Sequence, residues 1–137
     1  MTQQKQKKNP IFKRISNVES YMAERVGLNI SYDIGFREVI ILKRKVQIYY
    51  VNGLVDDSTV IEILKKLVDI NDNESNYKKL PEIIQNRLVN QQVDVIKTMD
   101  EAVDQILSGL VVVFIDGIDF GYVVDVRKYP GRSPEEP

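Results

Sequence analysis

The feature that most restricts the fold is the stretch from Leu110 to Arg127, which reads LVVVFIDGIDFGYVVDVR. Residues 110–115 are apolar at every position, which is typical of a central strand covered on both faces. The Asp116–Gly117 pair that follows favours a two-residue type I′ turn. The partner strand then alternates, and one of its faces is expected to need no cover. Its apolar face comprises Phe120, Tyr122, Val124 and Val126.

A second hairpin is predicted in residues 36–53, FREVIILKRKVQIYYVNG, with a charged tip at residues 43–45. A short strand is predicted at QQVDVIKT, residues 91–98. Apolar side chains at helical spacing predict helices at residues 16–27, 56–70, from Pro81 onward, and 98–109. Capping boxes are predicted for the second and fourth of these helices, from Thr59 to Glu62 and from Thr98 to Glu101.

Hairpins connected by helices indicate an α/β domain of the mixed α+β kind. We expect a sheet of about five strands with both parallel and antiparallel pairs, two β-hairpins, and three or four flanking amphipathic helices. Residues 1–14 are expected to form a disordered basic arm and residues 15–128 a single domain. Residues 129–137 are expected to be a proline-rich linker, because proline disfavours helix in the residue before it.

Composition excludes much of enzyme chemistry. The chain has no cysteine and no histidine, so disulfides, thiol nucleophiles, the usual zinc sites and Ser/His triads are absent. Its longest apolar run is far shorter than the roughly 20 residues that span a bilayer, and its start does not resemble a secretion signal. The body is acidic and lacks a basic stripe with interleaved aromatic residues, so no nucleic-acid partner is expected. The basic arm is expected either to be solvated or to contact a membrane surface.

Three patterns that could carry chemistry do not complete a site. Residues 69–80 begin like a calcium loop, but Glu74 stands where glycine is needed and Leu80 where a glutamate is needed. Asp116, Asp119 and Asp125 are too far apart along the hairpin to converge. The glycines form neither phosphate-binding pattern. We therefore expect no metal, no cofactor and no catalytic residues.

Tyr49 and Tyr50 are adjacent on a predicted strand, so their rings must point to opposite faces of the sheet. One ring is expected in the core. The other, assigned to Tyr50, packs in the same way if a helix covers its face. If that face is uncovered, Tyr50 is a candidate contact for another protein.

Three stretches resemble the N-terminal soluble region of the GerA family of spore germination proteins, the A subunits of germinant receptors. They are VQIYYVNGLVDDSTVIEIL (46–64), TMDEAVDQILSGLVVVFIDG (98–117) and VVDVRKYPGRSPEEP (123–137). The last stretch is the most specific, with its Asp-x-Arg strand end, Tyr129–Pro130, Arg132 and a Glu-Pro close. The resemblance extends over residues 16–137, all but the basic arm.

The resemblance implies a membrane-associated function. Members of this family are integral proteins of the spore inner membrane and act in germination through ion release, as oligomeric channel subunits. Their soluble region faces the cytoplasm, the spore core, and contains two small lobes, of which this chain would be the first. More soluble sequence and several membrane helices would then follow. The implied partners are copies of the protein itself and other germination membrane proteins.

Charged side chains near the linker are candidate contacts between domains or subunits, because such charges can pair across a polar interface. These residues are Arg127, Arg132, Glu135 and Glu136. The alternative is that they are solvated linker charges.

Two other functions remain open from the sequence. One is a small-molecule sensor that binds its ligand at the carboxyl ends of the strands, as open α/β sheets often do. The other is a hydrolase that uses carboxylates alone, which requires acidic side chains to converge in a pocket.

Overall fold

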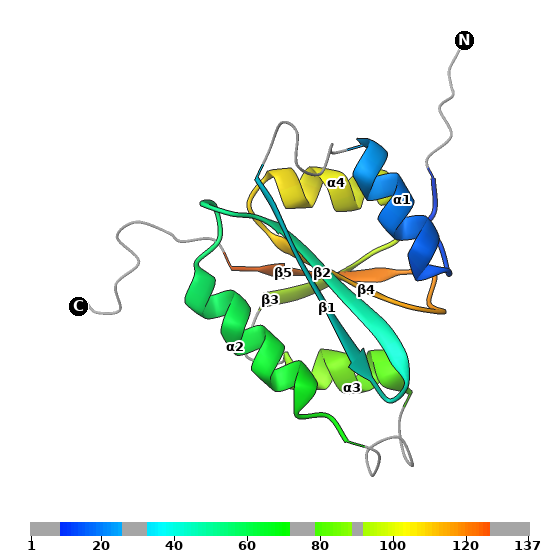
Figure 1. Cartoon of the computed structure of the whole chain (residues 1–137), viewed down its shortest axis with the longest axis vertical. Helices are drawn as coiled ribbons and strands as arrows, with labels where there is room; N and C mark the ends of the chain where they lie inside the picture. The colour runs from blue at the N-terminus through cyan, green and yellow to red at the C-terminus, as the bar shows by residue number, and fades with distance from the viewer. Residues whose placement is uncertain (1–8, 26–32, 72–78, 89–91, 127–137) are drawn as a thin grey trace, which may run out of the picture.

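The computed structural model describes residues 9–25, 33–71, 79–88 and 92–126. They form a five-stranded sheet with two helices on each face, which confirms the predicted α/β architecture (Figure 1). In chain order the elements are α1 (Ile15–Arg25), β1 (Ile34–Ile41), β2 (Arg44–Val51), α2 (Asp57–Val68), α3 (Leu80–Arg87), β3 (Gln92–Ile96), α4 (Met99–Leu107), β4 (Val111–Ile115) and β5 (Gly121–Asp125). Helices α1 and α4 cover one face of the sheet, and α2 and α3 cover the other.

The strand order is β1-β2-β4-β5-β3, and each neighbouring pair is antiparallel. The prediction of a mixed parallel and antiparallel sheet was therefore wrong. After β2 the chain passes through α2 and α3 to the far edge, forms β3, and returns through α4 into β4. This route leaves no described strand beside a parallel neighbour. Strand β4 lies in the middle with all five residues buried, as its apolar sequence predicted.

The connection between β4 and β5 is longer than the predicted two-residue turn. Strand β4 ends at Ile115 and β5 begins at Gly121, so residues 116–120 lie in the loop. The N–H of Asp116 instead donates to the carbonyl of Lys45 (2.9 Å), and the N–H of Gly117 donates to the carbonyl of Lys13 (2.6 Å). The pair still lies at the centre of a tight turn, since the Ile118 N–H donates to the Ile115 carbonyl (3.1 Å), but Gly117 alone of the two has a positive φ, so the turn is not type I′.

Strand β5 is covered on both faces, contrary to the prediction of one open face. Tyr122 and Val124 pack in the cluster under α2 and α3, whereas Val123 packs in the cluster under α1 and α4. The second face of β5 was predicted to be solvated because its residues alternate with the apolar ones and include glycine and aspartate. Val123 is the single apolar residue on that face. The presence of α4 above that face decides the outcome.

The β1–β2 hairpin is confirmed, with pairs running from Ile34 and Val51 to Ile41 and Arg44. Its turn is Leu42–Lys43, one residue earlier than the predicted tip. Both turn residues have positive φ, 50° and 70°. This is the backbone that type I′ turns require and that residues other than glycine, asparagine and aspartate adopt at a cost.

Helix ends were predicted with mixed success. The capping box from Thr98 to Glu101 is present at the start of α4, and Pro81 lies in the first turn of α3. Helix α2 begins within the predicted segment, but its N-cap is Asp56 rather than Thr59, and the Asp56 carboxylate accepts a hydrogen bond from the Ser58 N–H (3.2 Å). An aspartate at this position satisfies one of the free N–H groups of the first turn.

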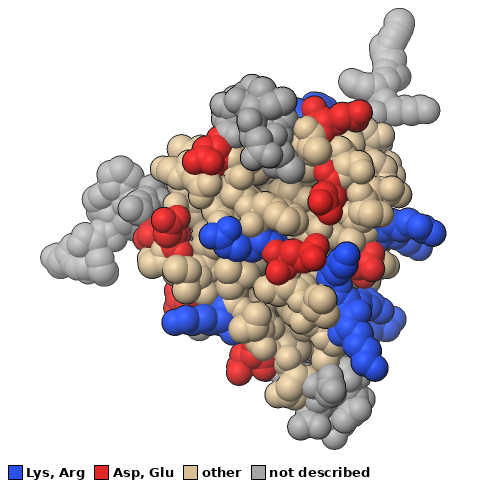
Figure 2. Space-filling model, in the orientation of Figure 1, with Lys and Arg blue, Asp and Glu red and all other residues tan. Residues whose placement is uncertain are grey.

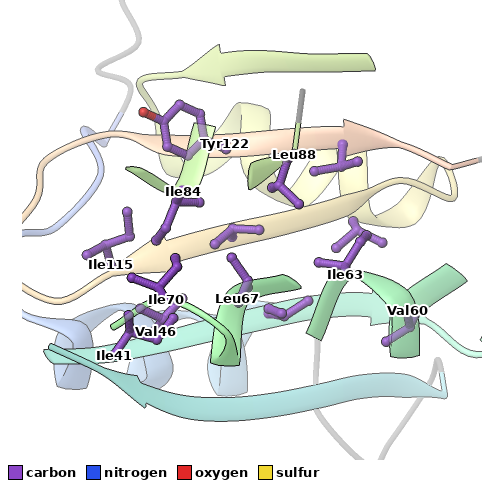
Figure 3. Close-up of a cluster of buried hydrophobic side chains, with 14 of the residues drawn as sticks. Ile41, Val46, Val60, Ile63, Leu67, Ile70, Ile84, Leu88, Ile115 and Tyr122 are labelled. Carbon is purple, nitrogen blue, oxygen red and sulfur yellow. The ribbon is translucent and has the colours of Figure 1, made fainter. Parts of the chain in front are cut away.

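The core has two layers, one on each side of the sheet. Figure 3 shows the layer under α2 and α3, where helix side chains such as Leu67 and Ile84 lie against the sheet residues Val46 and Ile115. The hydroxyl of Tyr122 donates to the Pro81 carbonyl (3.0 Å), which fixes α3 to this layer. The other layer packs side chains of α1 and α4 against the opposite face of the sheet.

Residues 9–14 are part of the folded domain, although they were predicted to belong to a disordered arm. Ile11 is buried under α1 and α4, and its N–H donates to the Lys97 carbonyl (3.1 Å). The Met99 N–H donates to the Asn9 carbonyl (2.7 Å). The prediction for residues 1–8 and for the linker at 129–137 lies outside the described residues.

Among the described helices, none is long and apolar enough to cross a membrane.

Candidate interaction surfaces

Tyr50 is 2% exposed and lies in the core layer under α2 and α3. An interface role required the second tyrosine of the pair to lie on an uncovered face, and both faces are covered, so Tyr50 is not available as a surface contact. Its ring lies over Gly35, its cross-strand partner on β1. The other candidate interface residues, Arg127, Arg132, Glu135 and Glu136, lie outside the described residues and stay a prediction.

The three aspartates of the β4–β5 region have separate positions. The Asp116 carboxylate accepts a hydrogen bond from the Ile15 N–H (3.0 Å) and so caps the start of α1. Asp119 is exposed in the loop before β5, and Asp125 is at the far end of that strand, opposite Gln92. They do not converge, so the condition for a carboxylate-dependent hydrolase is not met by these residues.

The first residue of the incomplete calcium loop has a structural role. Asp69, its first ligand position, pairs with Arg87 at 2.8 Å and joins the ends of α2 and α3. Residues 72–78 of the loop lie outside the described part of the chain. Within the described residues, no three acidic side chains lie close enough together to hold a metal ion.

A surface hollow of about 500 Å³ lies beside the edge strand β3. It is open to solvent and is lined by residues of β3, α4 and β5 and by Leu110. Its lining is mostly polar and includes the carboxylates of Asp94, Glu101 and Asp125. Small-molecule sites are usually enclosed and mostly apolar, so this hollow has the size of a ligand site but not its usual character.

A buried polar network lies under α1. Gln47 on β2 is fully buried and donates from Nε2 to Glu38 on β1 (2.8 Å) and to Glu19 on α1 (3.3 Å). The Tyr49 hydroxyl donates to Gln47 Oε1 (2.9 Å). Because each buried polar atom of Gln47 has a partner, the network ties α1 to the first two strands without leaving an unsatisfied group.

The pKa of Tyr49 is raised above its ordinary value by burial and, to a lesser extent, by the nearby carboxylates of Glu19 and Glu38. Burial likewise raises the pKa of Tyr50 and of Tyr122. Well below pH 10 all three hydroxyls keep their protons in both the folded and the unfolded chain. Above about pH 10 the unfolded chain loses these protons first, so the free energy of unfolding must fall as the pH rises.

The variant Tyr49→Phe is therefore expected to flatten the alkaline loss of stability. Tyr49 alone should contribute a decline of up to about 1.4 kcal/mol per pH unit above about pH 10. Urea unfolding of both proteins at pH 8, 10 and 11 measures this slope. At pH 8 the variant should be less stable by about 1 kcal/mol, because Gln47 Oε1 loses its donor. Equal slopes in the two proteins would contradict the assignment to Tyr49.

The outer side of α2 carries a second apolar stripe. Ile61 and Val68 are seven residues apart, which places them on one side of the helix, and they are 52% and 58% exposed. Leu54, just before the helix, is also exposed. Leu64 and Leu67, which lie between Ile61 and Val68 in the sequence, pack instead toward the core under α2 and α3. Helix α2 has more apolar side chains than one buried stripe accommodates, and this surplus is visible in the sequence. The six apolar residues are Val60, Ile61, Ile63, Leu64, Leu67 and Val68.

The two edges of the sheet differ in length. Strand β1 has eight residues and β3 has five, and each has one neighbour in the described sheet. Arg37 and Glu38 are exposed in the middle of β1. Charged side chains at the centre of an edge strand disfavour the addition of another strand. Each edge strand exposes one large apolar side chain, Ile40 on β1 and Val95 on β3, whereas α2 exposes two, Ile61 and Val68.

Comparison with known proteins assigns the family. The model of the Bacillus/Clostridium GerA spore germination protein matches residues 20–137. The chain is 44% identical over its full length to stage V sporulation protein AF of Bacillus subtilis (strain 168), covering 28% of that protein. It is 24% identical to spore germination protein KA of the same organism over 98% of this chain and 25% of that protein. It therefore spans about a quarter of the length of these relatives.

A solved structure has the same fold. It is the N-terminal domain of the A subunit of the Bacillus megaterium spore germinant receptor GerK3, with a TM-score of 0.76 and 22% identity. The match covers 92% of this chain and 51% of the solved one. The resemblance drawn from the sequence is thereby confirmed, and the chain belongs to the GerA family of spore germination proteins.

Proposed function

We propose that this chain is a non-enzymatic cytoplasmic lobe of a spore inner-membrane protein that acts in germination. Its role is to make contacts that assemble an ion-channel subunit with copies of itself and with other germination membrane proteins. Membership in the GerA family supports a role in spore germination. The dispersed positions of Asp116, Asp119 and Asp125 support a role through surfaces rather than through catalysis.

The observation that carries the proposal is the apolar stripe on the outer side of α2. Ile61 and Val68 together expose apolar area on a helix whose other side is already packed. Apolar side chains grouped on one surface are typical of contact sites. Strand β5 ends at the same end of the sheet at which α2 begins (Figure 1). The solved relative contains about as much chain again. We therefore place the following lobe of the longer protein against the α2 stripe.

The double variant Ile61→Glu/Val68→Lys tests this contact. Both substitutions suit a helix surface, and they cancel in charge, so the free energy of unfolding of the present chain should change by less than about 0.5 kcal/mol. In the full-length protein in membranes, the variant should release the following lobe. Protease cleavage within residues 129–137 is then expected to become at least about ten times faster.

Val95→Lys is the matched control, because Val95 is an exposed apolar residue on β3, at the other edge of the sheet. It should leave the cleavage rate unchanged. Equal rates in the wild type and in the α2 variant would contradict the placement of the following lobe. The assembly role is tested in the same membranes by chemical cross-linking, and trapping of monomers alone would count against it.

Ligand sensing is the second candidate function, and the hollow beside β3 is the observation that favours it. Its volume of about 500 Å³ lies within the range of small-molecule sites, and its carboxylates suit a cationic or hydrogen-bonding solute. A melting temperature raised by several degrees by one metabolite, but not by its close analogues, would support this function. Loss of that shift in Asp94→Asn would assign it to the hollow.

A further inference from the structure

Five exposed basic side chains meet at one end of the sheet, although they come from two segments about 30 residues apart. We call them the basic face: Lys13, Arg14, Lys43, Arg44 and Lys45. The Asp116–Gly117 loop joins the two segments, because its N–H groups donate to the carbonyls of Lys45 (2.9 Å) and Lys13 (2.6 Å). Figure 2 shows Lys and Arg side chains gathered over the β1–β2 turn and the start of α1, at the right of the view.

Within the described part of the chain, the cations of the basic face are not engaged in ion pairs, although Glu19 and Glu38 lie nearby, bound to Gln47. The acidic residues of the adjoining loop are Asp116 and Asp119, and the Asp116 carboxylate is already engaged by the Ile15 N–H at the start of α1. The whole chain has a net charge of −1, so the positive potential here is local. Such a local surplus of cations favours an anionic partner.

An exposed apolar residue lies beside these cations. Ile40 is 68% exposed and is the cross-strand partner of Lys45, next to the tip of the hairpin. The two residues of the tip, Leu42 and Lys43, both have positive φ. Asparagine and glycine adopt this backbone without strain, whereas leucine and lysine do not. Strained backbone of this kind is a recurring feature of functional loops. An apolar side chain amid lysines and arginines is the composition that binds membrane interfaces.

We propose that the basic face binds the anionic headgroups of a lipid bilayer, with Ile40 entering the interfacial layer. The cations project from turn and segment ends rather than around a cavity, an arrangement that suits an extended charged surface more than a single small anion. Nucleic acid would use the same cations but gains little from an exposed isoleucine. This inference goes beyond the proposed assembly role, and its test needs only the present chain.

Vesicle co-sedimentation tests the proposal. The chain should bind phosphatidylcholine vesicles that contain about one third phosphatidylglycerol and should not bind pure phosphatidylcholine. Binding should weaken as NaCl is raised, because salt screens exposed charges. Each cation at an anionic lipid surface strengthens partitioning about five-fold. The variant Lys43→Glu/Lys45→Glu is therefore expected to bind at least about 30-fold more weakly, and Ile40→Ser should weaken binding at constant charge.

Lys65→Glu/Lys79→Glu is the matched control, since it makes the same change of charge at two exposed lysines outside the basic face. It should lose far less binding than the variant of the basic face. Equal losses in the two variants would show a general charge effect and would overturn the proposal. Loss in Lys7→Glu/Lys8→Glu with none in the variant of the basic face would assign binding to the N-terminal arm and overturn it as well. Stronger binding to a duplex oligonucleotide than to the vesicles, at equal salt, would also reject a lipid partner.

Discussion

Replacing Phe114 by alanine is expected to lower the free energy of unfolding by about 3–5 kcal/mol, much of the stability of a domain of this size. Phe114 is 1% exposed on the central strand β4 and supports α1 and α4. Its ring meets Tyr49 edge to face, with centroids 5.7 Å apart. Tyr49 in turn contacts Phe36 on β1, at 5.1 Å. Truncation would leave a cavity at the β4 end of this aromatic row, in the core layer under α1 and α4. Urea unfolding measures the loss.

Phe36→Ala is the internal control, because Phe36 belongs to the same aromatic row but lies on the edge strand and is only partly buried. Its truncation should cost clearly less, on the order of 1–2 kcal/mol, since water can fill part of the space. If the two variants lost equal stability, the core would not be centred on β4 as the structure indicates.

Gly35→Val is expected to destabilise the domain by about 3 kcal/mol for a different reason. Gly35 faces Tyr50 across the β1–β2 pair, and a Cβ atom at this position would overlap with the tyrosine ring. The ring lies in the core under α2 and α3, so it cannot move aside without disturbing that layer. Overpacking of a filled core costs about 1–3 kcal/mol, and a bulky β-branched side chain against a ring should reach the upper end.

A double-mutant cycle separates this clash from a general intolerance of β1. Tyr50→Val alone should also destabilise the domain, because it leaves a cavity. The double variant Gly35→Val/Tyr50→Val should be more stable than Gly35→Val, since two valines form a favourable cross-strand pair. Losses that simply add would show that Gly35 is needed for a reason other than the tyrosine ring.

Several elements could be predicted because their causes are local. The capping box from Thr98 to Glu101 and the position of Pro81 in the first turn of α3 depend on groups within one helical turn. The central place of residues 110–115 followed from their apolar character on both faces. The family could also be recognised from three stretches of sequence, and the comparisons confirmed it.

The errors occurred where a distant segment competed with a local preference. The Asp116–Gly117 pair forms a tight turn but not the predicted two-residue hairpin connection, and its N–H groups donate to the carbonyls of Lys45 and Lys13 while the Asp116 carboxylate accepts from the Ile15 N–H. Tyr50 was a surface candidate only as long as the cover of its face was unknown, and α2 and α3 provide that cover. The basic face likewise joins residues 13–14 to residues 43–45 through a loop some 70 residues further along the chain.

The sequence by itself determined which segments are helices and strands, which of their sides are apolar, and to which family the chain belongs. These properties depend on side chains within a few residues of one another. Only the tertiary structure decided that the sheet is antiparallel, that both faces of β5 are covered, and which charged residues meet at its end. Which strands become neighbours in a sheet depends on how much apolar surface whole helices and strands bury. The free energy of this burial comes from residues that are far apart in the chain.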